Sequence, residues 1–368
     1  MEKFKNGFGK YLLMVKSSRV RDVVNQAKFK NKLKLDVFKK IFKENLKVNS
    51  EKVLIIGDKG KDDNLVAPII TNAYSMAADE LGLDFETVYQ NFKTRGESAD
   101  SVVISKLLKL PEESVVVVNI SNRIGNLGPV GLSFRKFNAQ RRNRFISSSS
   151  LGSLSNDKLG FLVNCLDINY ESIDKKTKRL VKILSDAREV NVSTKRGTDV
   201  TFDVDGMTGR GASGLYSEPG MGGNLPGSEA YIAPNLNGVN GDVVIDGSLR
   251  IKDRTLLLNN PVEIGISNGS ISSMNSSYEA RLLLQTLRWA KAKAKRPDNI
   301  FRVGELGLGL NKKADIIGST IIDEKAYRSA HVAIGSNSWF GGSIKTFIHL
   351  DQVFRNPIVK VDGRLIKY

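Results

Sequence analysis

The sequence predicts an α/β protein, with an N-terminal open α/β domain at residues 1–190 and a β-rich α+β domain at residues 191–368. A chain of 368 residues is long enough for two separate cores. Apolar runs typical of buried strands alternate with helical stretches in the first half, which indicates parallel βαβ units. From about Val190, short β-branched runs are broken by Gly and Asn, which is typical of antiparallel strands.

The predicted open layer spans about residues 50–190. Its elements, in chain order, are the strand KVLIIGD (52–58), a helix at 67–81, the segment FETVYQ (85–90), a helix near 98–110 and the apolar run SVVVVNIS (114–121). GDKGKDDN follows the first strand but lacks both the GxGxxG spacing and a GK[ST] ending. We therefore interpret it as a turn and not as a nucleotide site.

The second half contains three well-marked strand regions and one long helix. The strand regions are VNVSTKRGTDVTFDV (190–204), GDVVIDGSLRI (241–251) and PVEIGISNGSI (261–271), and the helix is SSYEARLLLQTLRWAKAKAK (276–295). These strand regions predict a β-rich second domain. The sequence shows no internal repeat.

Composition narrows the class of protein. With 40% apolar and 26% charged residues, the chain is expected to be globular. Cys165 is the only cysteine, so the chain can form no intrachain disulfide and no thiolate-cluster metal site. The first twenty residues hold only five consecutive apolar residues, and no apolar run has the length of a membrane span. We expect a cytoplasmic protein without a membrane partner.

The net charge of +17 raises the question of nucleic acid. Residues 1–52 carry fifteen Lys/Arg against five Asp/Glu, and this segment is expected to be a solvated or interdomain helix. FRKFNAQRRNR (134–144) has five basic residues and no acid, and could contact phosphate or a substrate carboxylate, although a surface helix or loop is the favoured interpretation. Nucleic acid is therefore not the expected partner.

Both histidines lie between residues 331 and 351, in HVAIGSNSWFGGSIKTFIHLD. If IHLD is a strand, its alternation places His349 and Asp351 on one face, where both can reach the same ion. His331 precedes them, separated by the Gly-containing turn SNSWFGGS. We expect one site to use both imidazoles.

Three glutamates complete the candidate set. Glu305 lies in the apolar run VGELGLGL, where an unpaired charge would be costly, while Glu229 follows the turn NLPGS and Glu324 precedes His331 in IIDEKAYRSAHVAIG. An inventory of carboxylates and imidazoles without sulfur suits Zn²⁺, Mn²⁺, Co²⁺ or Fe²⁺, and more than four ligands suit two ions. A serine triad is less supported, since the chain has no GxSxG motif.

Four of these pieces, in order, resemble the metalloaminopeptidases of the aminopeptidase T, aminopeptidase S and PepS type. The pieces are NLPGSEAYIAP, GELGLGLN, DEKAYRSAHVAIG and HLD, and the similarity covers about residues 190–363. The resemblance implies a homodimer that removes N-terminal residues from peptides with a free N-terminus. It also implies two divalent ions (Zn, Co or Mn) on Glu229, Glu305, His331, His349 and Asp351. In that scheme Glu305 bridges the two ions or accepts the proton of the attacking water, and Glu324 either supports the ligands or transfers a proton.

The sequence departs from that family at one position. The family has a tyrosine seven residues after the first histidine, where this chain has Ser338 followed by Trp339. The dihydroxypyridine ring-cleaving dioxygenases also look similar in the FGG…HxD region, but they use one Fe²⁺ and carry a histidine where this chain has Glu305. A metalloaminopeptidase is the main hypothesis. The alternatives are an enzyme of the dioxygenase type, another hydrolase, or a polyanion-binding protein with a degenerate site.

Overall fold

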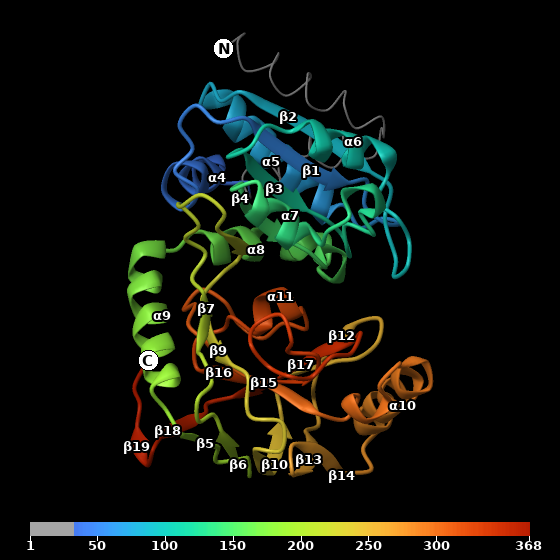
Figure 1. Cartoon of the computed structure of the whole chain (residues 1–368), viewed down its shortest axis with the longest axis vertical. Helices are drawn as coiled ribbons and strands as arrows, with labels where there is room; N and C mark the ends of the chain where they lie inside the picture. The colour runs from blue at the N-terminus through green and yellow to red at the C-terminus, as the bar shows by residue number, and fades with distance from the viewer. Residues whose placement is uncertain (1–32) are drawn as a thin grey trace. The chain divides into compact units, whose positions relative to one another are not determined.

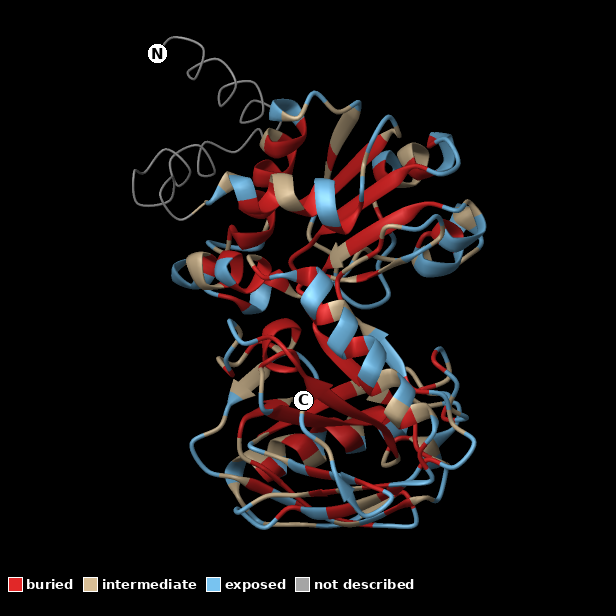
Figure 2. Ribbon diagram, turned by 90° about the vertical axis from the view of Figure 1, so that its left-hand side faces the viewer, coloured by how far each residue is buried: buried red, intermediate tan, exposed pale blue. Residues whose placement is uncertain are grey.

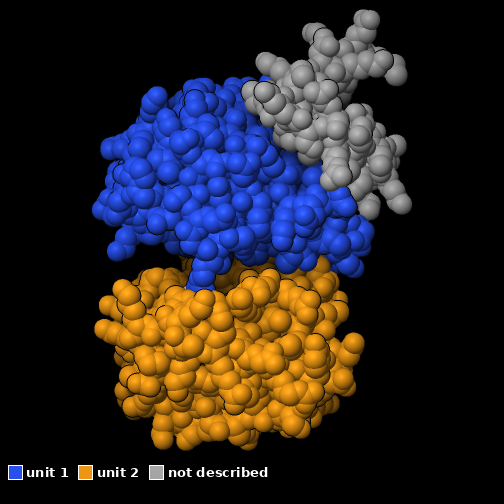
Figure 3. Space-filling view, turned by 90° about the vertical axis from the view of Figure 1, so that its right-hand side faces the viewer, with its two compact units in different colours: residues 1–170, 214–226 blue, residues 171–213, 227–368 orange. Residues whose placement is uncertain are grey.

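The structure is a computed structural model that describes residues 33–368. It divides into two compact units, which Figure 3 distinguishes by colour: unit 1 takes the described residues up to Tyr170 together with Gly214–Pro226, and unit 2 takes Glu171–Ser213 and Gly227–Tyr368. The predicted α/β class is confirmed. The predicted limit at residue 190 falls inside strand β5 (Glu189–Ser193) of unit 2. Most of the basic N-terminal segment lies outside the described residues.

Unit 1 is built on a five-stranded parallel sheet with the order β2-β1-β3-β4-β8. The strands are β1 (Val53–Asp58), β2 (Phe85–Gln90), β3 (Val115–Asn119), β4 (Arg144–Ser148) and β8 (Gly222–Asn224). The runs VLIIGD and VVVVN are buried along their whole length, because helices cover both faces of a parallel sheet. Strand β8 was not predicted, since its sequence GGN carries no strand pattern.

The helices of unit 1 confirm the predicted alternation. They are α4 (Leu35–Lys40), the π-helical turn η1 (Ile41–Asn45), α5 (Val66–Glu80), α6 (Ser101–Lys109), α7 (Phe134–Gln140), α8 (Leu159–Leu166) and the short turns η2 (Gly128–Val130), η3 (Leu151–Ser153) and η4 (Asn156–Lys158). Figure 1 shows α5 alongside β1. Between residues 33 and 368, no helix is both long and apolar enough to cross a bilayer.

The sequence suggested a solvated or interdomain helix for the basic N-terminal segment. The part of this segment that the structure describes also carries buried side chains. Phe38 and Phe42, from α4 and η1, are fully buried. Their rings lie 4.8 and 5.7 Å from the ring of Tyr74 on α5, in edge-to-face geometry. Apolar side chains among the lysines therefore fix this helix to unit 1.

Unit 2 contains two seven-stranded antiparallel sheets, with the orders β14-β13-β10-β6-β5-β18-β19 and β12-β11-β17-β16-β15-β9-β7. Besides β5, the strands are β6 (Asp199–Asp203), β7 (Arg210–Ala212), β9 (Glu229–Ile232), β10 (Val239–Ile245), β11 (Ser248–Arg250), β12 (Thr255–Leu257), β13 (Val262–Ser267), β14 (Ser270–Met274), β15 (Val303–Gly309), β16 (Ser329–Gly335), β17 (His349–Arg355), β18 (Ile358–Val361) and β19 (Arg364–Leu365). The helices are α9 (Tyr170–Ser185), α10 (Tyr278–Lys293), the turn η5 (Pro297–Asn299) and α11 (Thr320–Asp323). Strands β15 and β16 are buried throughout (Figure 2), so they can carry enclosed charged groups only if those groups are paired.

The close contact between β1 and α5 at Gly57 generates a first prediction. A Cβ added to Gly57 in β1 would lie 2.7 Å from Cγ2 of Thr71 in α5. Gly57→Ala should therefore lower the free energy of unfolding by about 1–3 kcal/mol, because the sheet and helix must move apart. Chemical denaturation measures the loss. In a Thr71→Ala background the same change should cost clearly less, and an equal cost in both backgrounds would contradict the proposed collision.

Candidate metal centre

The five predicted ligands lie on one face of the second sheet of unit 2. Adjacent strands β9, β15, β16 and β17 carry them. Glu305 pairs with Ala333, which pairs with Asp351, and residues directly opposite one another point to the same face. His331 lies opposite Gly307, and Glu229 lies opposite Gly309. The strand alternation predicted for His349 and Asp351 is therefore present, and it extends over four strands.

Small residues between these groups make room for them. A Cβ on Gly307 would overlap the imidazole of His331, so the ring of His331 rests directly on the backbone of β15. Ala333, between Glu305 and Asp351 in the register, is fully buried. The Gly-rich run VGELGLGL thus serves to accept side chains from the neighbouring strand.

The carboxylate of Glu305 joins the two imidazoles. His331 Nε2 lies 3.2 Å from one oxygen of Glu305, and His349 Nε2 lies 3.4 Å from the other. His349 Nε2 is also 3.1 Å from Asp351 Oδ1. The second nitrogen of His349, Nδ1, donates to the carbonyl of Ser336 at 2.8 Å, which fixes the ring with Nε2 toward the carboxylates.

A buried lysine, which the sequence interpretation missed, completes the cluster. The Lys325 side chain is 0% exposed, and its Nζ forms an ion pair with Glu229 and lies 2.7 Å from a carboxyl oxygen of Glu324. The preceding Asp323 holds this turn, because its carboxylate accepts from the backbone N–H groups of Ile317 at 2.8 Å and Gly318 at 3.1 Å. The available signal was a lysine beside Glu324 within a largely apolar stretch, where burial requires an acidic partner.

Seven side chains therefore form a closed ring of charges: Lys325, Glu229, His331, Glu305, His349, Asp351 and Glu324. Glu324 closes it through a hydrogen bond to Asp351. Burial, with added repulsion from Asp351 and Glu229, raises the pKa of Glu324 to about 8. Glu324 is accordingly protonated near neutral pH and donates to Asp351.

The two imidazoles respond in the opposite sense. Burial alone would lower the pKa of each, but contacts with carboxylates outweigh it. The pKa of His331 rises to about 9, mainly through Glu305, and that of His349 rises to about 10, mainly through Asp351. Burial raises the pKa of Asp351, yet His349 more than offsets this and leaves that pKa below its usual range. Near neutral pH the ring holds three cations and three anions.

The donors of this ring fit a divalent metal ion. Across residues 33–368, no three His, Cys, Asp or Glu side chains already converge as metal ligands. However, two ligands about 2.1 Å from one ion stand about 3.0–3.4 Å apart, and the three His–carboxylate separations are 3.1–3.4 Å. Replacement of the two protons by an ion thus requires little movement.

An aromatic cluster adjoins the most accessible member of the ring. The side chain of His349 is 24% exposed, whereas His331 is enclosed. Trp339, which is 57% exposed, has its ring centroid 4.8 Å from the imidazole of His349. Phe340 lies 5.2 Å from both Trp339 and Tyr231. A planar ligand that approaches His349 would therefore meet the indole of Trp339.

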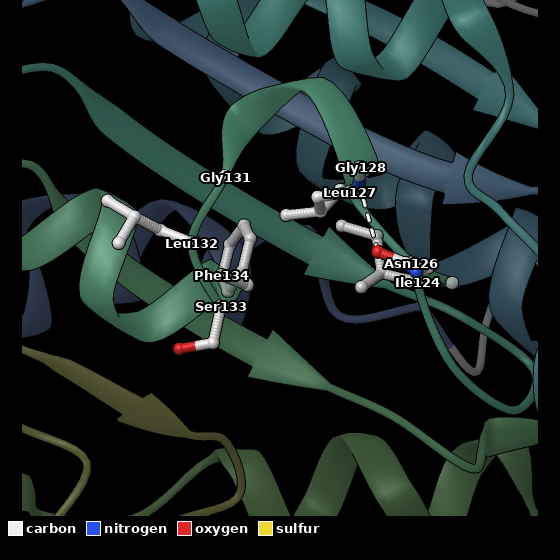
Figure 4. A pocket seen from close by; sticks show the side chains of 9 residues that line it. Ile124, Asn126, Leu127, Gly128, Gly131, Leu132, Ser133 and Phe134 are labelled. Atoms are coloured by element: carbon white, nitrogen blue, oxygen red, sulfur yellow. Dashed lines mark hydrogen bonds between the residues drawn. The ribbon is translucent and has the colours of Figure 1, made fainter.

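Unit 1 contains a separate cavity of about 540 Å³, formed by a single loop segment between residues 124 and 134. Figure 4 shows Leu127, Phe134 and their neighbours around it, with the amide of Asn126 bonded to the N–H of Gly128. None of its nine lining residues is titratable. The cavity therefore offers space for an apolar group but no acid or base.

The basic stretch 134–144 begins with the helix α7, in line with the favoured interpretation as a surface helix or loop. Three of its arginines have structural partners. Arg144 is buried and ion-pairs with Glu51, Arg142 ion-pairs with Glu113 at 2.7 Å, and Arg141 donates to the carbonyl of Leu110 at 2.6 Å. These charges therefore have a structural role within unit 1.

A match to a known protein family places the chain in a family related to metalloenzymes. A family profile described as 2,5-dihydroxypyridine 5,6-dioxygenase matches residues 166–367, which is more than half of the sequence. The chain belongs to this family. A sequence relative, the 2,5-dihydroxypyridine 5,6-dioxygenase of Pseudomonas putida, is 23% identical over 193 residues, which are 50% of this chain and 54% of the relative. The chain thus spans about half the length of that relative.

Two solved structures share the fold. The 2,5-dihydroxypyridine dioxygenase structure from Pseudomonas putida matches with a TM-score of 0.69 and 17% identity, over 90% of this chain and 94% of that one. AmpT from Thermus thermophilus matches with a TM-score of 0.58 and 16% identity, over 92% and 97%. The predicted resemblance to the aminopeptidase T group is confirmed as one of fold, while the family is the one predicted as the alternative.

The charge ring generates a second prediction. Because the chain has only two histidines, ¹⁵N-histidine labelling reports the ring nitrogens of two imidazoles alone. In metal-free protein both should stay protonated at neutral pH and titrate near pH 9 and 10. These pKa values lie above the ordinary histidine value of 6.5. The contribution of the two imidazoles to the stability of the folded protein is therefore complete below about pH 6.5 and is lost as the pH rises through 9–10.

The control is the same titration with Zn²⁺, which should abolish both transitions, because the ion displaces the protons. Two imidazoles that titrate near pH 6.5 without metal would show that they are not enclosed by the carboxylates.

Proposed function

We propose that the protein is a metal-dependent, ring-opening dioxygenase that acts on a hydroxylated, planar aromatic ring of the dihydroxypyridine kind. Membership of the 2,5-dihydroxypyridine 5,6-dioxygenase family supports this reaction class. The observation that carries the proposal is the meeting of two histidines and one aspartate beside an exposed tryptophan.

His331, His349 and Asp351 form a two-histidine, one-carboxylate set, the donor set of non-haem Fe²⁺ oxygenases. Bound Fe²⁺ would supply the redox chemistry that lets O₂ react with an electron-rich ring. One O₂ is consumed per ring opened and both oxygen atoms enter the product, so no separate reductant is required.

The remaining groups would bind the substrate and hold protons. Glu305, between the two imidazoles, is placed to accept the proton of a ring hydroxyl that enters beside His349. We assign Glu324 a positioning role, since it donates a hydrogen bond to Asp351 and contacts Lys325. Trp339 would stack against the flat substrate.

An aminopeptidase remains the second candidate, because AmpT shares the fold and because Glu229 and Glu305 stand on the same sheet face as the histidines. Ser338 lacks the phenol that the sequence comparison expects at this position. The two candidates differ in what they consume, since only the oxygenase requires O₂.

The proposed reaction gives a third prediction. The protein is first loaded with Fe²⁺ under anaerobic conditions and then transferred to buffer that contains O₂. On addition of 2,5-dihydroxypyridine it should consume O₂, and the absorbance of the ring should disappear. Asp351→Asn should lower the rate by about 100-fold or more, because it removes a ligand charge. Asp298→Asn, at an exposed turn of the same unit, is the matched control and should keep the wild-type rate.

Release of amino acids from peptides by the Zn²⁺- or Co²⁺-loaded protein, together with no O₂ uptake on a panel of hydroxylated pyridines, would favour the aminopeptidase and sink this proposal.

A fourth prediction concerns Trp339. Trp339→Leu should raise KM for the aromatic substrate about 2- to 10-fold, because a stacking contact is worth about 0.5–1.5 kcal/mol, and should change kcat little. Trp339→Phe should restore most of the affinity. If leucine and phenylalanine behave alike, the substrate does not stack on this residue.

A further inference from the structure

We propose that the ammonium group of Lys325 permanently occupies the second cation position of this centre, so that the protein binds one divalent ion per chain where the sequence resemblance implied two. The inference uses the metal centre of the proposed function but does not depend on which reaction that centre performs. It assigns a role to a residue that neither the sequence motifs nor the ligand set includes.

The contacts of Lys325 place it where a metal ion would otherwise lie. Glu229 was expected to bind metal, and one of its oxygens instead forms an ion pair with Lys325 Nζ. The other oxygen of Glu229 lies 4.0 Å from His331 Nε2, at the edge of the histidine–carboxylate group. Glu324, which is hydrogen-bonded to Asp351, is the second partner of the ammonium, at 2.7 Å. Lys325 thus joins Glu229 to the carboxyl group that supports Asp351.

The backbone prevents this lysine from withdrawing. The carbonyl of Lys325 accepts from the N–H of Asn311 at 2.8 Å, and the N–H of Tyr327 donates to the carbonyl of Asn311 at 2.9 Å. The turn lies directly on β15, because a Cβ on Gly309 would lie 2.9 Å from the carbonyl carbon of Lys325. With a fully enclosed side chain, Lys325 has no route to solvent in this conformation.

A fixed ammonium excludes a second ion by charge. Two cations within a few ångströms in an enclosed site repel each other strongly, and the carboxylates that would offset the repulsion are already paired. The far side of the ring differs, since its three His–carboxylate separations of 3.1–3.4 Å match the spacing of two ligands on one ion. The ring therefore has one cation position open to a metal ion, at His331, His349 and Asp351 beside Glu305, and one position that Lys325 fills.

The test is metal stoichiometry. Metal-free wild type, Lys325→Met and the surface control Lys360→Met are equilibrated with excess Mn²⁺ or Zn²⁺, and bound metal is counted by elemental analysis and calorimetric titration. Methionine keeps the length of the lysine side chain without its charge. We expect one ion per chain for wild type and Lys360→Met, and two for Lys325→Met, together with a larger rise in Tm on metal addition.

Wild type that binds no ion or two ions overturns the inference, as does folded Lys325→Met that binds one. If Lys325→Met is recovered only in the presence of metal, the inference is supported, because the buried carboxylate of Glu229 then needs a replacement cation. If it is not recovered at all, Lys325→Gln, which keeps a polar group beside Glu229, takes its place and should bind two ions; a folded Lys325→Gln that binds one ion would contradict the proposal. Failure of the ring-opening assay leaves these counts unchanged, so the two proposals are tested separately.

Discussion

The site of this protein depends on one constraint: charged groups enclosed on a sheet face must balance each other. Three anions and three cations alternate around a ring, and the seventh member, Glu324, avoids imbalance by keeping its proton. Removal of one partner from a buried ion pair typically lowers the free energy of unfolding by about 3–5 kcal/mol. Each charged member of the ring therefore depends on its neighbours. The strand register follows from this, since a slip of one residue would turn each of these groups to the opposite face.

Much of the fold was predictable because it depends on local pattern. The buried runs of β1 and β3, the long helix α10 and the alternation that puts His349 and Asp351 together are visible in the sequence. The contacts of His349 and Asp351 with side chains from other strands were only partly predictable, because they depend on the order of the strands in the sheet. The hydrophobic pattern of the sequence does not predict that Lys325, from a turn after α11, contacts Glu229 on β9. The burial of Phe38 and Phe42 was likewise hidden by the lysines between them.

The scaffold does not by itself select a reaction. The two solved relatives named above share the fold with this chain at 16–17% identity, and function is decided by particular side chains. Here those are Glu305 between two imidazoles, Ser338 followed by an exposed tryptophan, and a lysine among the carboxylates. The last of these changes the count of available cation positions without altering the sheet beneath it.

Strand β8 has a consequence for the order in which the chain can fold. Its three residues complete the parallel sheet of unit 1 by pairing with β4, although β5, β6 and β7 of unit 2 come between them in sequence. During synthesis the edge of β4 stays open until this late segment emerges, and only a few residues later the chain supplies Glu229. Such long-range pairing slows folding and leaves a strand edge exposed in the meantime. A fragment that ends before Gly222 would therefore present β4 as an edge to other chains, and neither unit corresponds to one uninterrupted piece of polypeptide.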